Sequence, residues 1–438
     1  MTKIVPYKRQ PLFDETILVL IKRKKKRRLL ARLLTSISLA HFKIKVIDRN
    51  PNRSDVDYDS VLQNIYEYKD KFPSIFTRMY RLSPVSFDKV LQSIKFSLQP
   101  DGPGGKNIVP PIIKFCLGLR LLAGGSYLDL AFGYKVLPNC IHTYAMEAIT
   151  AIAESEDPFL DNIKSPIHCT SHELEILESG FAKFSNNILR GTVAAGDGIV
   201  FRMIMPTYEE VDGDVISYYT RKGYYAFGLQ AFCDSKCKFL SISSVLCSSS
   251  GDNTAYIVTQ LAKDIKAGKL DKKYHVVMDE AYVCRDQEMT PYKGRRLSVE
   301  QDTFNYYLSL NRQVIERAFG ILVQRWGILW RPLRLNMMNR GTVIRAVCRL
   351  HNICIDDFGS AGNCSTLRRQ TVEKFLDEND HQGGDRNTPQ YIDSSSGGRG
   401  RRSDLERSNH RESWTEIIRD RNMSRPVYSK SYKKVIRP

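Results

Sequence analysis

The chain has 438 residues, a mass of 50.2 kDa and a formal net charge of +18. This length allows two or three domains, and a hydrophobic content of 42% is enough for a sizeable core. No apolar run reaches the roughly 18 residues of a membrane-spanning helix, and no secretory leader precedes the basic tract. We therefore expect no membrane association and a polyanionic partner, most simply DNA, with a merely basic soluble protein as the alternative.

The positive charge is concentrated near the N-terminus. Residues 1–50 contain 14 Lys or Arg and 3 Asp or Glu, a net charge of 14 − 3 = +11. At their centre lies an unbroken basic run, made of Lys22, Arg23, Lys24, Lys25, Lys26, Arg27 and Arg28. Such a run is typical of a nuclear-localisation signal or a nucleic-acid-binding patch, although a solvated charge run has the same composition. We predict a basic N-terminal segment over residues 1–70 and a location in the nucleus.

Helical patterns dominate residues 71–160. Ser83 and Pro84 provide a cap and a first turn for one helix, and residues 111–123 form the next. We predict a helical domain for this part of the chain.

The end of this helical part has the spacing of a helix-turn-helix. A short helix over 126–132 and a turn over 133–138 precede a helix over 139–149, which Asn139 would cap. The last helix would then read a DNA groove. Any small three-helix bundle would show a similar pattern, so both interpretations remain open.

Strand patterns begin at about residue 189. Residues 190–205 contain two β-like runs around Asp197 and Gly198, and further runs cover 224–232 and 239–246. These short runs, separated by turn residues, predict a β-sheet.

The chain then alternates between helix and strand. A helix capped by residues 249–252 precedes a short strand that ends at Asp279. A long amphipathic helix over 304–329 carries Glu316, and a further helix covers 342–355.

The C-terminal composition changes to Ser, Gly, Arg, Asp and Glu. Residues 393–402 contain too little apolar material to fold. We predict that residues 185–356 form one domain and that 357–438 form a disordered tail.

The order of strand, strand, strand, helix, strand and late helix is the plan of ribonuclease-H-like nucleases. In that α/β plan the fourth strand lies beside the first and the late helix packs across the mixed sheet. Asp197, Asp279 and Glu316 are separated by 279 − 197 = 82 and 316 − 279 = 37 positions, and the plan would bring them to one point. Clustered carboxylates suit Mg²⁺ or Mn²⁺, and two such ions can assist an in-line attack on a phosphodiester.

Six segments between residues 197 and 352 resemble the catalytic domain of PIF/Harbinger-type DDE transposases and the Harbinger transposase-derived nucleases. Residues 72–154 also resemble the helix-rich N-terminal region of that family. The six segments, in chain order, are Asp197-Gly198 with Pro206, Tyr219 to Tyr224, Ser249 to Asp252, Asp279 to Tyr282 with Thr290 to Gly294, Phe304 to Trp326 around Glu316, and Leu350 to Asn352.

The sequence departs from the family pattern at three places. Ile199 and Val200 stand where the family has Thr-His, and Gly251 stands where it has His. Glu280 directly follows Asp279, where the family has a small residue. Glu280 is either a solvated neighbour or a group that alters metal occupancy.

The resemblance implies a role for each candidate residue. Asp197 would bridge two divalent metal ions, Mg²⁺ or Mn²⁺, while Asp279 and Glu316 would each complete one coordination shell. Arg312, one helical turn before Glu316, would neutralise the acids or contact DNA phosphate. The list of implied DNA-binding residues is Arg221, Lys222 and Arg312.

The resemblance also implies partners. They are DNA and a separately encoded Myb/SANT-like DNA-binding protein, and the chain itself is a candidate homo-oligomer.

Each candidate also has an ordinary structural interpretation. Asp197 could form a turn with Gly198, Asp279 could cap the following segment, and Glu316 could lie on a helix surface. The basic candidates could form solvent-facing ion pairs. Ten dispersed cysteines include no CxxC pair, and we expect reduced, mostly buried thiols. A zinc site at Cys348, His351 and Cys354 would require the helix to end there.

Three functions are therefore compared. The leading hypothesis is a metal-dependent DNA endonuclease or transposase. The alternative is a domesticated chromatin or transcription protein that binds DNA without cutting it. An RNA-directed ribonuclease-H-like enzyme is the third, which the fold permits but the family segments do not favour.

Overall fold

The structure is a computed structural model that describes residues 58–99, 108–244, 251–294, 297–359 and 408–426. All of these residues belong to one compact unit, Tyr58–Pro438. The predicted localisation tract at 22–28, most of the segment 1–70 and much of the tail 357–438 lie outside the described residues. Within the described ranges, no helix is both long enough and apolar enough to cross a membrane.

The first part of the described chain is entirely helical. Its α-helices are α2 (Asp59–Lys71), α3 (Pro73–Tyr80), α4 (Pro84–Ile94), α5 (Pro111–Leu122), α6 (Tyr127–Tyr134) and α7 (Pro138–Glu154). Ser83 caps α4 as predicted, since its Oγ accepts a hydrogen bond from the backbone N–H of Ser86 at 3.1 Å. Helical structure begins earlier than the predicted boundary at residue 71, because α2 buries Val61 and Ile65.

The predicted helix-turn-helix pair corresponds to α6 and α7. Asn139 does not cap the second helix as expected, because α7 already begins at Pro138, whose fixed φ suits a first helical turn. The apolar side of α7 is buried, whereas Asn139, His142 and Thr143 are exposed near its start. The groove-reading role of α7 stays a prediction.

Five strands of the described chain form one mixed sheet in the order β3-β2-β1-β4-β5. Their bounds are β1 (Thr192–Arg202), β2 (Ala226–Cys233), β3 (Phe239–Ser243), β4 (His275–Val277) and β5 (Glu288–Met289). The pairs β1–β2 and β2–β3 are antiparallel, while β1–β4 and β4–β5 are parallel. The fourth strand thus lies beside the first. A helical region followed by this sheet and its flanking helices confirms the predicted ribonuclease-H-like fold class.

The strand β1 runs without a break through Asp197, which corrects the prediction of two separate β-like runs. Asp197 is paired with Ala231 in continuous antiparallel register. The turn that Gly198 suggested does not form. On the other side of Asp197, Gly196 serves close packing, because a methyl group there would collide with the ring of Phe232. The first acid is therefore held in the middle of a strand, which fixes its position firmly.

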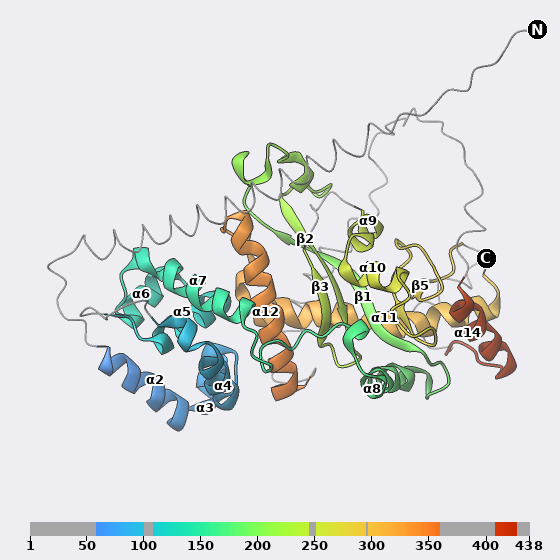
Figure 1. Ribbon diagram of the computed structural model, residues 1–438, viewed down its shortest axis with the longest axis horizontal. Helices are drawn as coiled ribbons and strands as arrows, with labels where there is room; N and C mark the ends of the chain where they lie inside the picture. The colour runs from blue at the N-terminus through green and yellow to red at the C-terminus, as the bar shows by residue number, and fades with distance from the viewer. Residues whose placement is uncertain (1–57, 100–107, 245–250, 295–296, 360–407, 427–438) are drawn as a thin grey trace, which may run out of the picture. The chain divides into compact units, whose positions relative to one another are not determined.

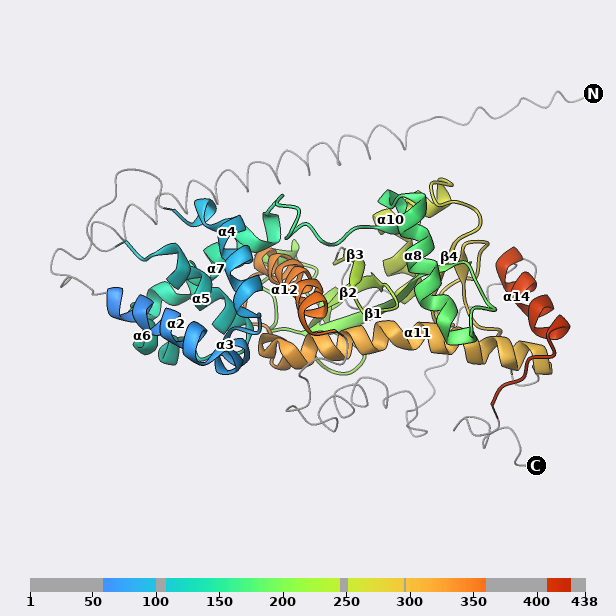
Figure 2. The same cartoon turned by 90° about the horizontal axis from the view of Figure 1, so that it is seen from below.

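Helices flank both faces of the sheet. They are α8 (Ser171–Ala182), α9 (Asp252–Ile257), α10 (Gln260–Lys266), α11 (Val299–Arg325) and α12 (Met337–Phe358). Figure 2 shows α11 on one side of the sheet and α8 and α10 on the other. Leu174 of α8 shares a buried cluster with Val193 and Met278, so the sheet region begins before the predicted boundary at 185. Short 3-10 turns connect these elements at η1 (Phe96–Leu98), η2 (Pro166–His168), η3 (Lys183–Ser185), η4 (Glu209–Val211), η5 (Ile216–Tyr218) and η6 (Gly327–Trp330).

The single helix predicted after residue 252 is divided into α9 and α10. The first helix ends at Ile257 with Val258 as its C-cap. Thr259 caps the second, because its Oγ1 accepts a hydrogen bond from the N–H of Ala262 at 3.1 Å. Figure 1 shows α9 and α10 next to each other beside the strands.

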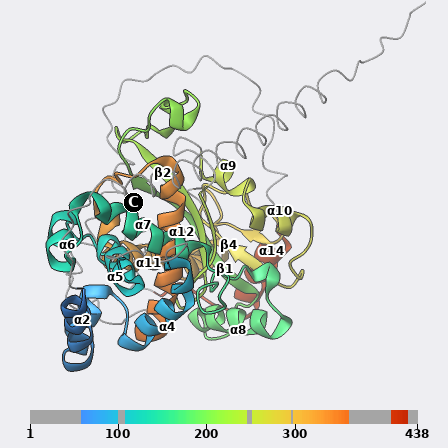
Figure 3. The same cartoon turned by 60° about the vertical axis from the view of Figure 1, so that its left-hand side comes forward.

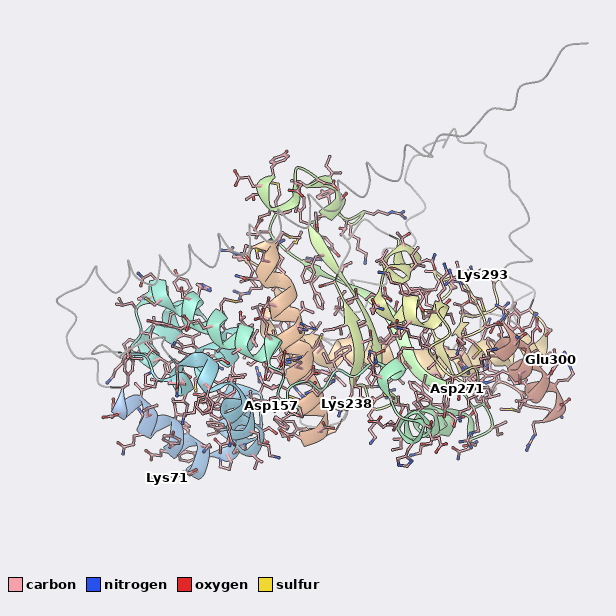
Figure 4. The ribbon with its side chains drawn as sticks, in the orientation of Figure 1. Lys71, Asp157, Lys238, Asp271, Lys293 and Glu300 are labelled. Carbon is pink, nitrogen blue, oxygen red and sulfur yellow. The ribbon has the colours of Figure 1, made fainter. Side chains whose placement is uncertain are left out.

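The helix α12 joins the helical region to the sheet, and Figure 3 shows it beside α7. Arg349 of α12 is buried and donates hydrogen bonds to the carbonyl oxygens of Ile152 and Ser155, at 3.0 and 2.7 Å. Close to the end of α12, Lys238, which is labelled in Figure 4, pairs with Asp356 at 2.7 Å. Polar contacts therefore tie the two parts together through one helix.

A C-terminal helix corrects the prediction of disorder over 357–438. The helix α14 (Asn409–Asp420) packs against the far end of α11 from α12. Trp414 and Ile418 are buried, and the indole N–H of Trp414 donates to the carbonyl oxygen of Arg190 at 2.9 Å. The polar composition of the tail hides this short amphipathic stretch, whose two apolar residues are spaced four apart on one helix face.

Candidate active site

Three neighbouring elements supply the predicted acids. The parallel register of β1 and β4 pairs Ala195 with Val277, and Asp197 and Asp279 each follow these partners by two residues. Glu316 comes from α11, which packs across the same sheet. The structure thus brings the three sequence-predicted acids into one neighbourhood, where their charges act on one another.

Arg312 lies between two of these acids. Its Nη1 is 2.5 Å from Oε1 of Glu316 and 3.5 Å from Oδ2 of Asp197. The first contact is the i,i+4 pair that a helix places on one face. The other carboxylate oxygen of Asp197, Oδ1, accepts a hydrogen bond from the N–H of Gly198 at 2.7 Å.

The carboxylates of this group outnumber the positive charges beside them, so the site favours binding of a further cation. The pKa of the Asp197 carboxyl is raised to about 7, chiefly by burial; Arg312 and the Gly198 N–H oppose the rise, and the charges of Asp279 and Glu316 add to it. Burial lowers the pKa of Arg312, but the charges of Glu316, Asp197 and Asp279 outweigh burial and raise it overall. One guanidinium is therefore shared by several carboxylates.

The residues fit divalent metal ions in kind and in charge. All three acids offer the hard oxygen ligands that Mg²⁺ and Mn²⁺ prefer. As the side chains stand, no three His, Cys, Asp or Glu residues in the described ranges converge closely enough to hold an ion. The guanidinium of Arg312 stands in for a cation between Asp197 and Glu316, so an ion that uses both acids requires Arg312 to move aside.

Sequence reasoning missed a fourth acid, Asp252. It is the first residue of α9, and a methyl group on Gly198 would lie 3.2 Å from its Oδ1. Burial and the charge of Asp279 raise the pKa of the Asp252 carboxyl. The sequence suggested a helix cap at this position, but the capping residue is Gly251, without a side-chain bond. The signal that could have found Asp252 is topological, since the helix after the third strand starts over the first strand.

Two neutral polar residues complete the surroundings. Gln230 of β2 donates a hydrogen bond from Nε2 to the hydroxyl of Tyr282 at 2.8 Å. Burial and the charges of Asp197, Asp252 and Asp279 raise the pKa of Tyr282. This hydroxyl therefore lies among three acids and stays protonated.

The other predicted DNA-binding residues lie away from the acids. Arg221 and Lys222 occupy a turn between Tyr219 and Tyr225, which form an isolated bridge in the connection from β1 to β2. Arg221 is exposed. Asp197 and the last residue of β1, Arg202, are five residues apart, which corresponds to about 17 Å along a strand. The turn with Arg221 and Lys222 lies beyond that end of the strand.

The zinc alternative is not supported by the structure. The helix α12 continues past Cys348, His351 and Cys354, and all three are buried within it. His351 Nε2 contacts the carbonyl oxygen of Cys237 at 2.8 Å, which removes that nitrogen from any metal. All eight cysteines in the described part of the chain are free thiols.

Comparisons with known proteins agree with this geometry. The profile of the DDE superfamily endonuclease family matches residues 196–352, which span Asp197, Asp252, Asp279 and Glu316. The chain is also similar to "Protein ALP1-like" of Arabidopsis thaliana, with 24% identity over 312 residues that cover 65% of this chain and 71% of that protein. No solved structure matches the chain.

Proposed function

Because residues 196–352 form a DDE superfamily endonuclease domain, we propose that the chain is a metal-dependent DNA endonuclease or transposase of the PIF/Harbinger type. It would cut DNA phosphodiester bonds and, as a transposase, join the freed 3′ end to a target. The observation that carries this proposal is the meeting of Asp197, Asp279 and Glu316 around one guanidinium inside the matching segment.

The residues of the candidate site would have different roles in the reaction. Asp197, Asp279 and Glu316 would hold the divalent ions, because three neighbouring elements bring their hard oxygen ligands to one place. Bound Mg²⁺ or Mn²⁺ supplies activation of the attacking oxygen and neutralisation of charge at the leaving oxygen. Arg312, once released from Glu316, would be free to bind a DNA phosphate, for which its planar fork is suited. Tyr282 and Gln230 would hold polar contacts beside the acids without adding charge.

DNA binding would draw on charge outside the acid group. Arg221 and Lys222 extend from the far end of the β1–β2 pair and could follow the DNA backbone. The net charge of +18 supports a polyanionic partner. We further propose a Myb/SANT-like partner that recognises the DNA ends, self-association of the chain, and a nuclear location.

The direct test is cleavage of supercoiled plasmid with Mg²⁺ or Mn²⁺, with the wild type beside Glu316→Gln. Each protein is assayed alone and with a candidate Myb-like partner. Metal-dependent nicking that disappears in the variant would support the nuclease. Wild-type protein that binds DNA but never nicks it, even with the partner, would contradict cleavage.

The alternative is a DNA-binding chromatin or transcription protein that keeps the domain but does not cut. The ion pair of Arg312 with Glu316 favours this alternative, because an arginine that stays in place blocks joint use of Asp197 and Glu316 by an ion. Comparing metal binding by wild type and an Arg312 variant separates the two functions.

The nuclear proposal has its own test. Deletion of Lys22–Arg28 should reduce nuclear accumulation of the full chain, seen by fluorescence microscopy, because the tract supplies seven basic charges. The same deletion should reduce the salt dependence of DNA binding if the tract touches phosphates. An unchanged distribution in cells would contradict the targeting role.

A further inference from the structure

Three arginines stand at the C-terminal ends of three helices. Arg81 is the C-cap of α3, Arg120 lies in the last turn of α5, and Arg325 is the last residue of α11. Arg325 follows Glu316 by 325 − 316 = 9 residues, which corresponds to about 14 Å along a helix. The arginines are therefore a group separate from the acids of the candidate active site.

Backbone contacts bring the ends of these three helices together. Nη1 of Arg120 donates to the carbonyl oxygen of Met79 at 2.9 Å, two residues before Arg81. The end of α5 also packs on the chain just after α11, because a methyl group on Gly327 would come within 2.5 Å of the carbonyl oxygen of Ala123. Figure 2 shows this end of α11 beside α3 and α5. The three arginines therefore stand around one junction.

A buried thiol of α12 places two of the arginines more closely. Sγ of Cys354 donates to the carbonyl oxygen of Arg81 at 3.2 Å. Burial raises the pKa of this thiol, whereas the charge and a hydrogen bond of Arg325, and the charge of Arg81, oppose the rise. The guanidinium groups of Arg81 and Arg325 therefore both lie near Cys354.

None of these three arginines forms an ion pair with a carboxylate in the described part of the chain. The acid Asp357 also acts on the Cys354 thiol. Its two oxygens, however, accept hydrogen bonds from the N–H of Ser83 at 3.4 Å and the hydroxyl of Ser86 at 2.8 Å. Like charges held together without a counter-ion destabilise the folded state, and an anion bound between them would remove that cost.

The repulsion acts most clearly on Arg81. Burial lowers the pKa of Arg81, and the charges of Arg120, Arg325 and Arg78 lower it further. The thiol of Cys354 opposes this change. Arg81 and Arg120 are half-buried, whereas Arg78 is exposed one turn earlier on α3. The positive charge of the junction therefore extends to the surface.

Two guanidinium nitrogens of the junction are buried and unsatisfied. Arg325 is 9% exposed, and its Nη1 has no hydrogen-bond partner among the described residues, nor has Nε of Arg81. Arginines at helix ends ordinarily donate to the free carbonyl oxygens there, as Arg120 does. That role leaves these two nitrogens unexplained. Because buried donors are nearly always satisfied, we expect them to have a partner from outside the chain.

We propose that Arg81, Arg120 and Arg325 bind a phosphate group between the ends of α3, α5 and α11. A phosphate group supplies negative charge and several acceptor oxygens, which suit planar guanidinium donors. The ring of Phe358 supports Arg325, whose Cζ lies 5.7 Å from the ring centroid. The phosphate group belongs either to a DNA backbone or to a free phosphate ion. Its assignment to DNA rests on the proposed function, whereas binding of phosphate does not.

The test is a titration of the full chain with inorganic phosphate at constant ionic strength and without metal, followed by the melting temperature. Phosphate should raise the melting temperature of the wild type, because a ligand of the folded state stabilises it. Arg81→Gln and Arg325→Met should each weaken phosphate binding at least ~10-fold, as expected for a lost hydrogen bond to a charged group.

Arg419→Gln is the matched control. Arg419 is exposed on α14, at the other end of α11, and its substitution also removes one positive charge. Phosphate binding by this variant should equal that of the wild type. An equal rise in melting temperature for the wild type and all three variants would be a general salt effect and would overturn the proposal.

Folding is checked on the same proteins without phosphate. Arg325→Met keeps an unbranched side chain beside Phe358 and removes a buried charge, so it should melt at the wild-type temperature or higher. Arg81→Gln should behave in the same way, because burial and like charges disfavour the charged form of Arg81. Melting far below the wild type for both variants would mean that these arginines hold the fold together and would overturn the proposal.

Titration of a short DNA duplex at several salt concentrations decides the source of the phosphate group. If the ligand is the DNA backbone, Arg325→Met should reduce the slope of log affinity against log salt by ~0.9, the value for one phosphate contact. An unchanged slope together with lost phosphate binding would assign the site to a free phosphate ion. Absence of plasmid cleavage by the wild type would contradict the nuclease alone, since phosphate binding requires neither metal nor cleavage.

Discussion

The strand β4 is only three residues long, and the groups at its start and just past its end have opposite chemistry. At its start, His275 is fully buried, contacts Oγ1 of Thr192 at 2.8 Å, and packs against the rings of His410 and Trp414. Burial and the nearby His410 lower its pKa well below the ordinary value, so it stays neutral. Just past the other end, Asp279 stands among carboxylates that are short of positive charge.

The difference shows how to tell a titratable group that stabilises the fold from one that serves a functional site. A group that has become neutral and is packed by aromatic rings stabilises the fold. A group kept among like charges destabilises it and needs a ligand. One lies at the start of a short strand and the other two residues past its end, so position along the chain does not distinguish them.

The largest expected effect is the loss of DNA cleavage when one of the acids near the end of β4 is replaced. Asp197→Asn should reduce plasmid nicking by about 10³-fold or more, because one member of a catalytic unit is removed. Circular dichroism should match that of the wild type, and the variant should melt at the same temperature or higher, because the substitution removes a buried carboxyl from among like charges. Residual nicking at the wild-type rate would remove Asp197 from the site.

At the other end, Trp414→Ala should destabilise the protein by about 3–5 kcal/mol, the cost of truncating a buried tryptophan. Denaturant unfolding measures this change. Phe132→Ala is the control, because Phe132 is 91% exposed and a substitution there should stay within about 0.5 kcal/mol. Equal effects for both would mean that α14 is not part of the folded domain.

A third prediction concerns pH in the metal-free protein. The folded pKa of Asp197, about 7, lies above the ordinary value of about 3.9, so the folded state holds this proton more tightly than the unfolded state. Its contribution to stability is therefore complete below about pH 4 and falls by up to about 1.4 kcal/mol per unit as pH rises to 7. Asp197→Asn should lack this fall. Parallel pH profiles of stability for wild type and variant would contradict the raised pKa.

The smallest expected effect is that of Arg312→Gln on ion binding. Without the competing guanidinium, Mn²⁺ affinity should rise by a few-fold, roughly 1 kcal/mol, the scale of a half-exposed ion pair. DNA cleavage should fall at the same time if Arg312 contacts phosphate. A loss of Mn²⁺ affinity would mean that Arg312 supports the ion instead of competing with it.

Part of the fold and of the site was predictable from the sequence, because it depends on local sequence patterns and on the order of strands and helices along the chain. Ser83 and Pro84 mark a helix start through their own backbone chemistry. The placement of Asp197 beside Asp279 follows from the strand order, since a parallel fourth strand beside the first leaves both acids at the same level. Helical periodicity then sets Arg312 and Glu316 on one face.

Other features depend on contacts that no local pattern records. Asp252 resembled a helix cap, and only the packing of α9 over β1 puts its carboxylate near Gly198. The break that Gly198 suggested does not exist, because β1 continues through it in antiparallel register with β2. The helix α14 lies in a polar stretch whose average composition conceals Trp414 and Ile418.

Arg349 limits how far the helical region and the sheet can turn against each other. Its guanidinium binds two carbonyl oxygens at the end of α7 and the carboxylate of Asp161 at 2.7 Å, while its backbone belongs to α12 beside the sheet. A joint with three bonds resists rotation far better than a loop. The contacts of this one arginine therefore hold the end of α7 at a fixed distance from the sheet and its acids.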